Sequence, residues 1–406
     1  MKRKYILWVV IVLAMLGSAC KEKKKATTTA ESLQLPVIHI VTEKEIPWDK
    51  RIPCVMSVVT NHDSVSWSGK VKFRGGISSK YHKHSYSVKL SAAQSLCGMP
   101  ENRSWILNAS YIDKTFMRHK LCYDLFNMMG YNDLAPKCAY ALVRENNQPQ
   151  GLYVVMQRLN KHVLNIDEDD PEAIIFKEPK LFYPDSKMPA KDPLDENYHG
   201  QSYPDFEKGD RSAVIDEFRN FIVKTSDEAF YNHIGEWIDL QNLIDWHLLI
   251  LFTNSGDGVL KNFYLYKKDA GTPFRIALWD CDHSLGRDGD NEKNMLKHLP
   301  EERRNILIDR MMKSDEYVQR LKSRYTELRR SGIFSYENIE KLMKENDPYV
   351  RLGLEENTRL WPYDSENYYD AATYDEEYAL ILEFVKRSIA RLDALLSPSK
   401  KPEPKL

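Results

Sequence analysis

The stretch "NSGDGVLKNFYLY", residues 254–266, places Asp257 and Asn262 five positions apart in a glycine-flanked turn that runs into an aromatic strand. An Asp carboxylate can take a proton from a hydroxyl, and an Asn amide oxygen can bind a metal ion. The same two residue types are also common in ordinary turns after helices, where they serve only the backbone. The sequence on either side of this turn is therefore needed to tell a catalytic and metal-binding site from an ordinary turn.

A second acidic stretch, "ALWDCDHSLG" at residues 277–286, ends another apolar strand with Asp280 and Asp282. Protein kinases have the same residue types in the same order. A catalytic Asp is followed five positions later by a metal-binding Asn, and a further metal-binding Asp comes after the next strands. Carboxylate and amide oxygens are ligands that Mg²⁺ prefers. A lone Asp-x-Asp is more often a solvated turn, but in this order it favours phosphoryl transfer.

The stretch "VKFRGGISSKYHKHSYSVKL", residues 71–90, joins two predicted strands through a glycine turn. Two glycines let the backbone approach a ligand, and exposed N–H groups together with Arg74, Ser78 and Ser79 can bind phosphate. The period of two in the second strand places Lys89 on the face opposite its apolar neighbours. The alternative is a plain Gly-Gly hairpin with solvated lysines.

The first half of the chain is predicted to be rich in strands. Residues 55–90 are rich in Val, Ser, Tyr and Phe between turn residues and fit a small antiparallel sheet. Residues 113–130 show helical spacing of apolar side chains with a glycine at the end, and residues 138–159 are typical of a hairpin. The order is therefore sheet, helix, hairpin, within an N-terminal lobe of about 46–160.

The second half is predicted to be helical. Residues 161–212 contain many prolines and acidic residues and are interpreted as a long irregular connection or an insertion. From 213 to 397 apolar residues recur at spacings of three and four, and Asp239 is a good N-cap for a buried helix. The predicted fold class is α+β, with a β-rich N-terminal lobe and a helical C-terminal lobe in one domain, 46–397.

The N-terminus predicts export. Residues 1–19 combine basic residues with a short apolar run and small residues, which is typical of a signal peptide rather than a membrane span. Cys20 follows Gly-Ser-Ala as in a bacterial lipobox, so lipidation is expected there; a simple secretory signal or a structural Cys are the alternatives. Residues 20–45 are predicted as a flexible tether and 398–406 as a disordered tail.

Charge and cysteine content exclude two classes of function. The 58 basic and 59 acidic residues nearly cancel, so nucleic acid is not an expected partner. No Cys-x-x-Cys occurs, which argues against a thiolate metal cluster. Most cysteines are expected to be buried small hydrophobes, and a pairing of Cys54 with Cys97 or Cys138 stays open.

With these motifs in order, residues 50 to 395 resemble the CotH family, the spore-coat protein H kinases. The motifs that carry the resemblance are "FRGGISSKYHKHSYSVKL", "WILNASYIDKTFMRHKLCYDLFNMMG", "QGLYVVMQRL", "NSGDGVLKNFYLY" and "ALWDCDHSLG". The resemblance implies an atypical protein-kinase-like, two-lobed fold that uses ATP with Mg²⁺ or Mn²⁺. Gln157 stands where the family commonly has Glu, near the expected hinge between the lobes.

The resemblance also implies roles for individual residues. Asp113 and Arg118 match a helix-entry motif, as a structural ion pair or with a phosphate-facing Arg. The other roles are a catalytic Asp257; metal ligands Asn262 and Asp280, with Asp282 as a second or supporting carboxylate; a phosphate-covering loop of Arg74, Gly75, Gly76, Ser78 and Ser79; and nucleotide contacts from Lys89, from Lys83 as a second basic residue, and from Gln157.

The expected function is an exported kinase, lipid-anchored to the bacterial cell envelope through Cys20. It would transfer the γ-phosphoryl of ATP to Ser or Thr of an envelope or secreted protein. The alternative is a catalytically inactive, kinase-like surface binding or adhesion lipoprotein. The acceptor and the oligomeric state have no signature in the sequence.

Overall fold

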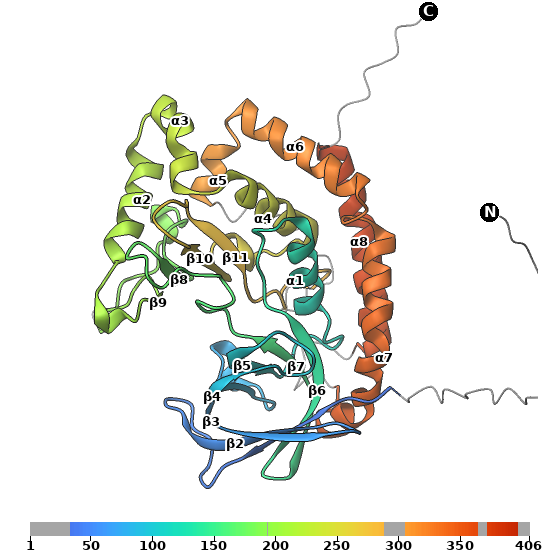
Figure 1. The fold of residues 1–406 in the computed structure, drawn as a ribbon. Coiled ribbons are helices and arrows are strands. Elements are labelled where there is room, and N and C mark those ends of the chain that lie inside the picture. The colour runs from blue at the N-terminus through green and yellow to red at the C-terminus, as the bar shows by residue number, and fades with distance from the viewer. Residues whose placement is uncertain (1–32, 193, 288–304, 364–371, 397–406) are drawn as a thin grey trace, which may run out of the picture. The chain divides into compact units, whose positions relative to one another are not determined.

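The N-terminal strands form a closed barrel (Figure 1). The computed structural model describes residues 33–192, 194–287, 305–363 and 372–396. The strand order is β1-β2-β3-β4-β5-β7-β6, and a parallel pairing of β1 with β6 closes the ring, while all other neighbours are antiparallel. These strands are β1 (Val37–Val41), β2 (Ile52–Val59), β3 (Ser64–Arg74), β4 (Ser85–Gln94), β5 (Asn102–Asn108), β6 (Cys138–Glu145) and β7 (Gln148–Gln157). Closure leaves this part of the chain without a free sheet edge.

The alternation predicted for β4 is confirmed. Tyr86 and Val88 are buried in the barrel core, whereas Lys89 between Val88 and Leu90 is exposed. Because successive side chains of a strand point to opposite faces, Lys89 lies on the outer surface of the barrel. The predicted small antiparallel sheet is thus one part of a larger closed structure.

The prediction of a tether over residues 20–45 is wrong at its C-terminal end. Val37–Val41 form β1, and Ile38 and Ile40 are fully buried in the barrel. The alternation of "VIHIV" is typical of a strand, although it directly follows a polar, low-complexity segment.

The interpretation of residues 161–212 as an irregular connection is also incomplete. The segment supplies β8 (Ile174–Lys177) and β9 (Gln201–Tyr203) to a second sheet in the order β11-β10-β8-β9. The other two strands are β10 (Phe263–Lys267) and β11 (Arg275–Leu278). A four-residue strand between prolines carries too short a pattern to be recognised, and its pairing with β10 is what stabilises it.

Helices make up most of the C-terminal half. Asp239 caps α4 as predicted, because its Oδ1 accepts hydrogen bonds from the backbone N–H groups of Gln241 at 3.0 Å and Asn242 at 3.2 Å. Every side chain of α4 from Asn242 to Thr253 is buried. The α+β class with a β-rich N-terminal part is therefore confirmed. The helices are α1 (Arg118–Met129), α2 (Ser212–Lys224), α3 (Asp227–Trp237), α4 (Leu240–Thr253), α5 (Ile306–Met311), α6 (Asp315–Arg330), α7 (Tyr336–Leu360) and α8 (Tyr374–Leu396).

The cysteines of the described residues form no disulfide. Cys54, Cys97 and Cys138 are free thiols, so neither of the pairings left open by the sequence is present. Residues 1–32, with the predicted signal peptide and Cys20, and the predicted tail at 398–406 lie outside the described residues. In the described ranges, no helix has the length and apolar character needed to cross a bilayer.

Two buried carboxyl groups give the fold a predicted pH dependence. Burial, followed by the charge of Asp245 and a hydrogen bond with it, raises the pKa of Asp133 to about 8. Asp133 Oδ1 accepts a hydrogen bond from Asn242 Nδ2 at 2.8 Å. An Asn at position 133 would mimic the protonated acid, since its amide can accept from Asn242 and donate to Asp245.

The folded-state pKa of Asp133 is raised, so its contribution to stability is complete below the unfolded value and is lost as pH rises through about 8. We expect Asp133→Asn to gain stability relative to the wild type by roughly 1–3 kcal/mol between pH 5 and pH 9. Urea unfolding of both proteins at the two pH values measures this difference. A difference that does not change with pH would contradict it.

Candidate active site

The turn after α4 carries Asp257 and Asn262. Asn254 ends α4 with a left-handed φ of 51°, and a short 3-10 helix begins at Asp257. The Asp257 side chain is 20% exposed, and its Oδ2 lies 2.9 Å from Lys261 Nζ. Asn262 also has a left-handed φ, 62°, directly before β10. Asn tolerates this conformation better than most residues, which explains its use at both bends.

Asp280 is held by three side chains. Tyr123 Oη accepts a hydrogen bond from the Asp280 backbone N–H at 2.9 Å, and Asn262 Nδ2 donates to the Asp280 carbonyl at 3.0 Å. His119 Nε2 lies 3.1 Å from Asp280 Oδ1. These contacts fix a residue whose own φ is left-handed, at 54°. The structure therefore brings the two predicted metal ligands Asn262 and Asp280 together.

His119, Asp280 and Asp282 form a group suited to a cation. One ligand atom from each residue lies within 4.8 Å of the other two. The Asp280 side chain is 38% exposed and the Asp282 side chain 25%, while His119 is buried. Burial and then the charge of Asp280 raise the pKa of Asp282. Two carboxylates and an imidazole, with the amide of Asn262 beside them, fit a divalent cation.

Basic side chains lie close to these carboxylates. Partial burial acts to raise the pKa of Asp280, but the hydrogen bond and charge of His119, with the charges of Arg74 and Lys177, hold it below its usual range. The Arg74 guanidinium stands 5.7 Å from the ring centre of Trp279. We call His119, Asp280 and Asp282 the acidic group. The predicted phosphate-covering loop therefore reaches the acidic group through Arg74.

The glycine turn has one position that requires glycine. Gly75 has φ 144°, and a Cβ there would collide with Ser78 Oγ. No atom lies within 4 Å of a Cβ built on Gly76. Ser79 Oγ donates a hydrogen bond to the Gly76 carbonyl at 2.7 Å and so closes the turn. The loop is a defined 3-10 turn with an exposed Gly76 backbone, and of its two serines Ser79 already uses its hydroxyl.

The structure separates the two lysines. Lys89 is exposed on the outer face of the barrel. Lys83 is buried, and its ammonium donates to the Ala109 carbonyl and to Asn357 Oδ1, each at 2.9 Å, and to the Leu152 carbonyl. Because these acceptors lie in the protein interior, Lys83 joins the barrel to α7 and lies outside the acidic group.

We expect Lys83→Met to lower the free energy of unfolding by about 1–3 kcal/mol, since it leaves buried acceptors without a donor. The midpoint for binding of ATP with Mn²⁺ should be the same in Lys83→Met as in the wild type. Lys89→Met, at an exposed position, should instead change nucleotide binding and leave the free energy of unfolding unaltered. Urea unfolding and calorimetric titration of both variants measure the two effects. The opposite pattern would place Lys83 at the nucleotide.

Gln157 is buried at the end of β7. Its Oε1 accepts from the Lys137 N–H at 3.3 Å and its Nε2 donates to the Pro100 carbonyl at 3.2 Å. The side-chain amide is thus engaged with backbone groups of the protein. Its neighbour Arg158 lies near Tyr264 on β10: burial raises the pKa of Tyr264, while the charges of Arg158 and Arg74 oppose that rise.

Asp113 and Arg118 form a buried ion pair, the first of the two roles considered for them. Arg118 Nη1 lies 2.7 Å from Asp113 Oδ1, and Nη2 lies 2.8 Å from Glu377 Oε2 on α8. Arg118 Nε donates to the Ser284 carbonyl at 3.0 Å. The guanidinium therefore ties the start of α1 both to α8 and to the loop that follows Asp282.

Three residues around Asp280 have no counterpart among the residues expected from the sequence: His119, Tyr123 and Lys177. His119 and Tyr123 are four residues apart in α1 and so lie on one face of that helix. This spacing was the available signal, since two polar aromatic side chains lie on one face of an apolar helix. The sequence around Lys177 carries no pattern that would place it at the site, because the four-residue strand β8 that it ends is too short to be predicted.

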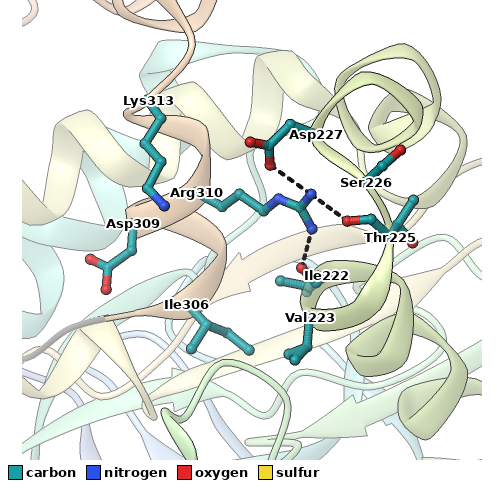
Figure 2. A pocket seen from close by; sticks show the side chains of 9 residues that line it. All are labelled: Ile222, Val223, Thr225, Ser226, Asp227, Ile306, Asp309, Arg310 and Lys313. Atoms are coloured by element: carbon teal, nitrogen blue, oxygen red, sulfur yellow. Dashed lines mark hydrogen bonds and ion pairs between the residues drawn. The ribbon is translucent and has the colours of Figure 1, made fainter.

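A further pocket of about 490 Å³ lies between α2, α3 and α5 (Figure 2). None of its lining residues belongs to the site described above. Its Arg310 is engaged with the carbonyls of Ile222 and Thr225 and with Asp227 Oδ1. The guanidinium thus joins α5 to the turn between α2 and α3.

The sequence that forms this fold and site matches a known protein family. A family model described as CotH kinase protein matches residues 71–390. The chain therefore belongs to the CotH family. It is 25% identical over 355 residues to the inner spore coat protein H of Bacillus subtilis (strain 168). The matched region covers 85% of this chain and 90% of that protein. An inner spore coat protein H-like protein of the same organism is 26% identical over 170 residues, 42% of this chain and 45% of that protein.

Proposed function

We propose that this protein is an exported protein kinase with an atypical, two-lobed kinase-like fold. It transfers the γ-phosphoryl group of ATP to Ser or Thr of an envelope or secreted protein. The observation that carries the proposal is the contact between Asn262 Nδ2 and the Asp280 carbonyl. It supports one site built from the turn after α4 and the turn after β11, in the order that kinases use.

In this proposal Asp257 positions the acceptor hydroxyl and takes its proton. Its carboxylate is partly exposed beside Lys261, so an acceptor can reach it from solvent. Asn262 holds the metal through its amide oxygen, since its Nδ2 is engaged with the Asp280 carbonyl. Asp280 and Asp282 supply carboxylate oxygens to the same ion.

A bound Mg²⁺ or Mn²⁺ would neutralise charge on the ATP phosphates. In this proposal the phosphates also meet Arg74, the exposed backbone at Gly75 and Gly76, and Ser78, while Lys89, on the outer face of the barrel, is a further proposed nucleotide contact. Positive side chains and free N–H groups favour a polyphosphate. Catalysis would then rest mostly on positioning and electrostatics.

The proposed location is the bacterial cell envelope, with a lipid on Cys20 as the membrane anchor and an envelope protein as substrate. The proposal rests on the sequence pattern of residues 1–20. ATP is scarce outside the cytoplasm, so an exported kinase needs a local supply of nucleotide. That condition makes nucleotide binding the first property to test.

The rival is a kinase-like surface binding or adhesion lipoprotein that has lost ATP use. The engagement of Lys83 and Gln157 within the protein favours it, because two expected nucleotide contacts are occupied.

A thermal-shift titration separates the kinase from the binding protein. An active site is stabilised by ATP with Mn²⁺ by about 2.7 kcal/mol at a ligand concentration of 100 Kd. No shift at millimolar ATP with Mn²⁺ would favour the binding protein.

A further inference from the structure

The acidic group includes the imidazole of His119, which is not among the metal ligands expected from the sequence, Asn262, Asp280 and Asp282. His119 comes from α1, far in sequence from the two acidic turns, and its Nε2 is 3.1 Å from Asp280 Oδ1. Its side chain is 2% exposed. A ligand atom of His119 lies within 4.8 Å of a ligand atom of both Asp280 and Asp282. Opposite ligands of one ion lie about 4.0–4.4 Å apart when the metal–ligand bonds are about 2.0–2.2 Å, so these three atoms need move only by a few tenths of an ångström or less to share an ion.

The surroundings of His119 point to a role in this site. Its Nδ1 has no hydrogen-bond partner among the described residues. The nitrogen that faces the carboxylates is Nε2, so Nε2 and not the unpartnered Nδ1 is the atom that could bind an ion there. Here the side-chain hydrogen bond of the ring is the one to Asp280, so its chemistry is directed at the acidic group.

The support around Asp280 shows that the group is fixed in advance. Tyr123, one turn after His119 in α1, accepts a hydrogen bond from the Asp280 N–H at 2.9 Å, and Asn262 holds the carbonyl. α1 is itself anchored by the buried ion pair between Arg118 and Asp113. The imidazole and the carboxylate therefore keep their relative position without a ligand.

We infer that His119 is a direct nitrogen ligand of the metal, together with Asp280 and Asp282, and that the site selects a first-row transition ion such as Mn²⁺ over Mg²⁺. This inference rests on the proposed metal-dependent function. Mg²⁺ takes oxygen ligands, whereas imidazole suits transition ions. The imidazole also comes from α1, so the position of that helix sets the metal affinity.

The opposing view is that His119 only orients Asp280 by donating a hydrogen bond from Nε2. His119→Gln distinguishes the two roles, because the Gln amide can still donate to Asp280 but offers no imidazole nitrogen. His283 is the matched control. Its Nε2 lies 4.0 Å from Asp282 Oδ1, so it is a second imidazole next to these carboxylates among the described residues.

The test is pulsed electron paramagnetic resonance of Mn²⁺ bound to the full chain, which detects the nuclear spin of a coordinated ¹⁴N. We expect a ¹⁴N modulation in the wild type and in His283→Ala, and its loss in His119→Gln. The preference for Mn²⁺ over Mg²⁺, measured by competition, should fall at least about tenfold in His119→Gln.

Mn²⁺ that binds the wild type without ¹⁴N modulation would overturn the role of His119 and leave the proposed kinase intact. A modulation that is lost in His283→Ala and kept in His119→Gln would also overturn it. A wild type that binds no Mn²⁺, alone or with ATP, would remove the proposed function as well. Even if His119→Gln does not fold, the role of His119 is overturned by a wild-type spectrum without the modulation or by a modulation that is lost in His283→Ala.

Discussion

Asp280→Asn is expected to abolish phosphoryl transfer and to remove the stabilisation by ATP with Mn²⁺, without unfolding the protein. The reason lies in the geometry of the site. Asp280 supplies the carboxylate that faces His119 at 3.1 Å, and its two backbone groups are already bound by Tyr123 and Asn262. Asp280→Asn therefore removes a negative charge that would hold a divalent cation, while the hydrogen bonds to the backbone of residue 280 remain. We expect at least a hundredfold loss of transfer, on the order of 2.7 kcal/mol or more.

Asparagine is preferred to alanine because the φ of Asp280 is 54°. Alanine in the left-handed region costs about 1–2 kcal/mol, whereas Asn tolerates it. The matched control is Asp195→Asn at an exposed position outside the site, which should leave transfer and thermal shift unchanged. Transfer by Asp280→Asn within a factor of a few of the wild type would show that Asp280 holds no catalytic metal.

Arg118→Ala should cause the largest loss of stability among single substitutions near the site. Arg118 is fully buried between Asp113 and Glu377 and also binds the Ser284 carbonyl. Its removal leaves two buried carboxylates with one cation fewer. Breaking a buried ion pair from one side typically costs about 3–5 kcal/mol. Urea unfolding at neutral pH measures this loss.

Arg351→Ala is the control for this effect. Arg351 also lies on a helix and contacts two carboxylates, those of Asp347 and Asp375, but its side chain is 47% exposed. Exposed pairs contribute about 0–1 kcal/mol each. Equal losses of stability for Arg118→Ala and Arg351→Ala would contradict the structural role given to Arg118. Where Arg118→Ala gives no soluble protein, Arg118→Lys keeps the charge and should show an intermediate loss.

The contact between Asn262 and Asp280 was predictable from the sequence. An antiparallel pair of strands brings the residue before the first strand close to the residue after the second. Phe263 pairs with Leu278 in β10 and β11, so their flanking residues meet at the same end of the sheet. The spacing of the two acidic stretches therefore carried real structural information.

The imidazole of His119 was not predictable in the same way. α1 reaches the acidic group only through packing against distant elements, including the contact of Arg118 with α8. Closure of the barrel has the same character, because the parallel pairing of β1 with β6 joins residues 37–40 to residues 142–145. Local patterns identify strands and helices, whereas such pairings depend on the whole core.

Lys83 shows why a motif can mislead. It precedes β4 by two residues, in a segment where the alternation of the strand does not yet apply. The family resemblance implied a nucleotide contact for it, but three acceptors in the interior bind its ammonium instead. A buried lysine with such acceptors has a structural role, which the two-variant comparison with Lys89 tests.

The most direct test of the proposed function follows the phosphate of ATP. The purified full chain is incubated with Mn²⁺, with serine-rich proteins of the cell envelope, and with ATP labelled at either the γ or the α phosphate. The wild type should transfer the γ label to protein and not the α label, and Asp257→Ala should transfer neither. Protein that carries the α label would indicate nucleotidyl transfer, and γ transfer at the wild-type rate by Asp257→Ala would contradict the assigned site.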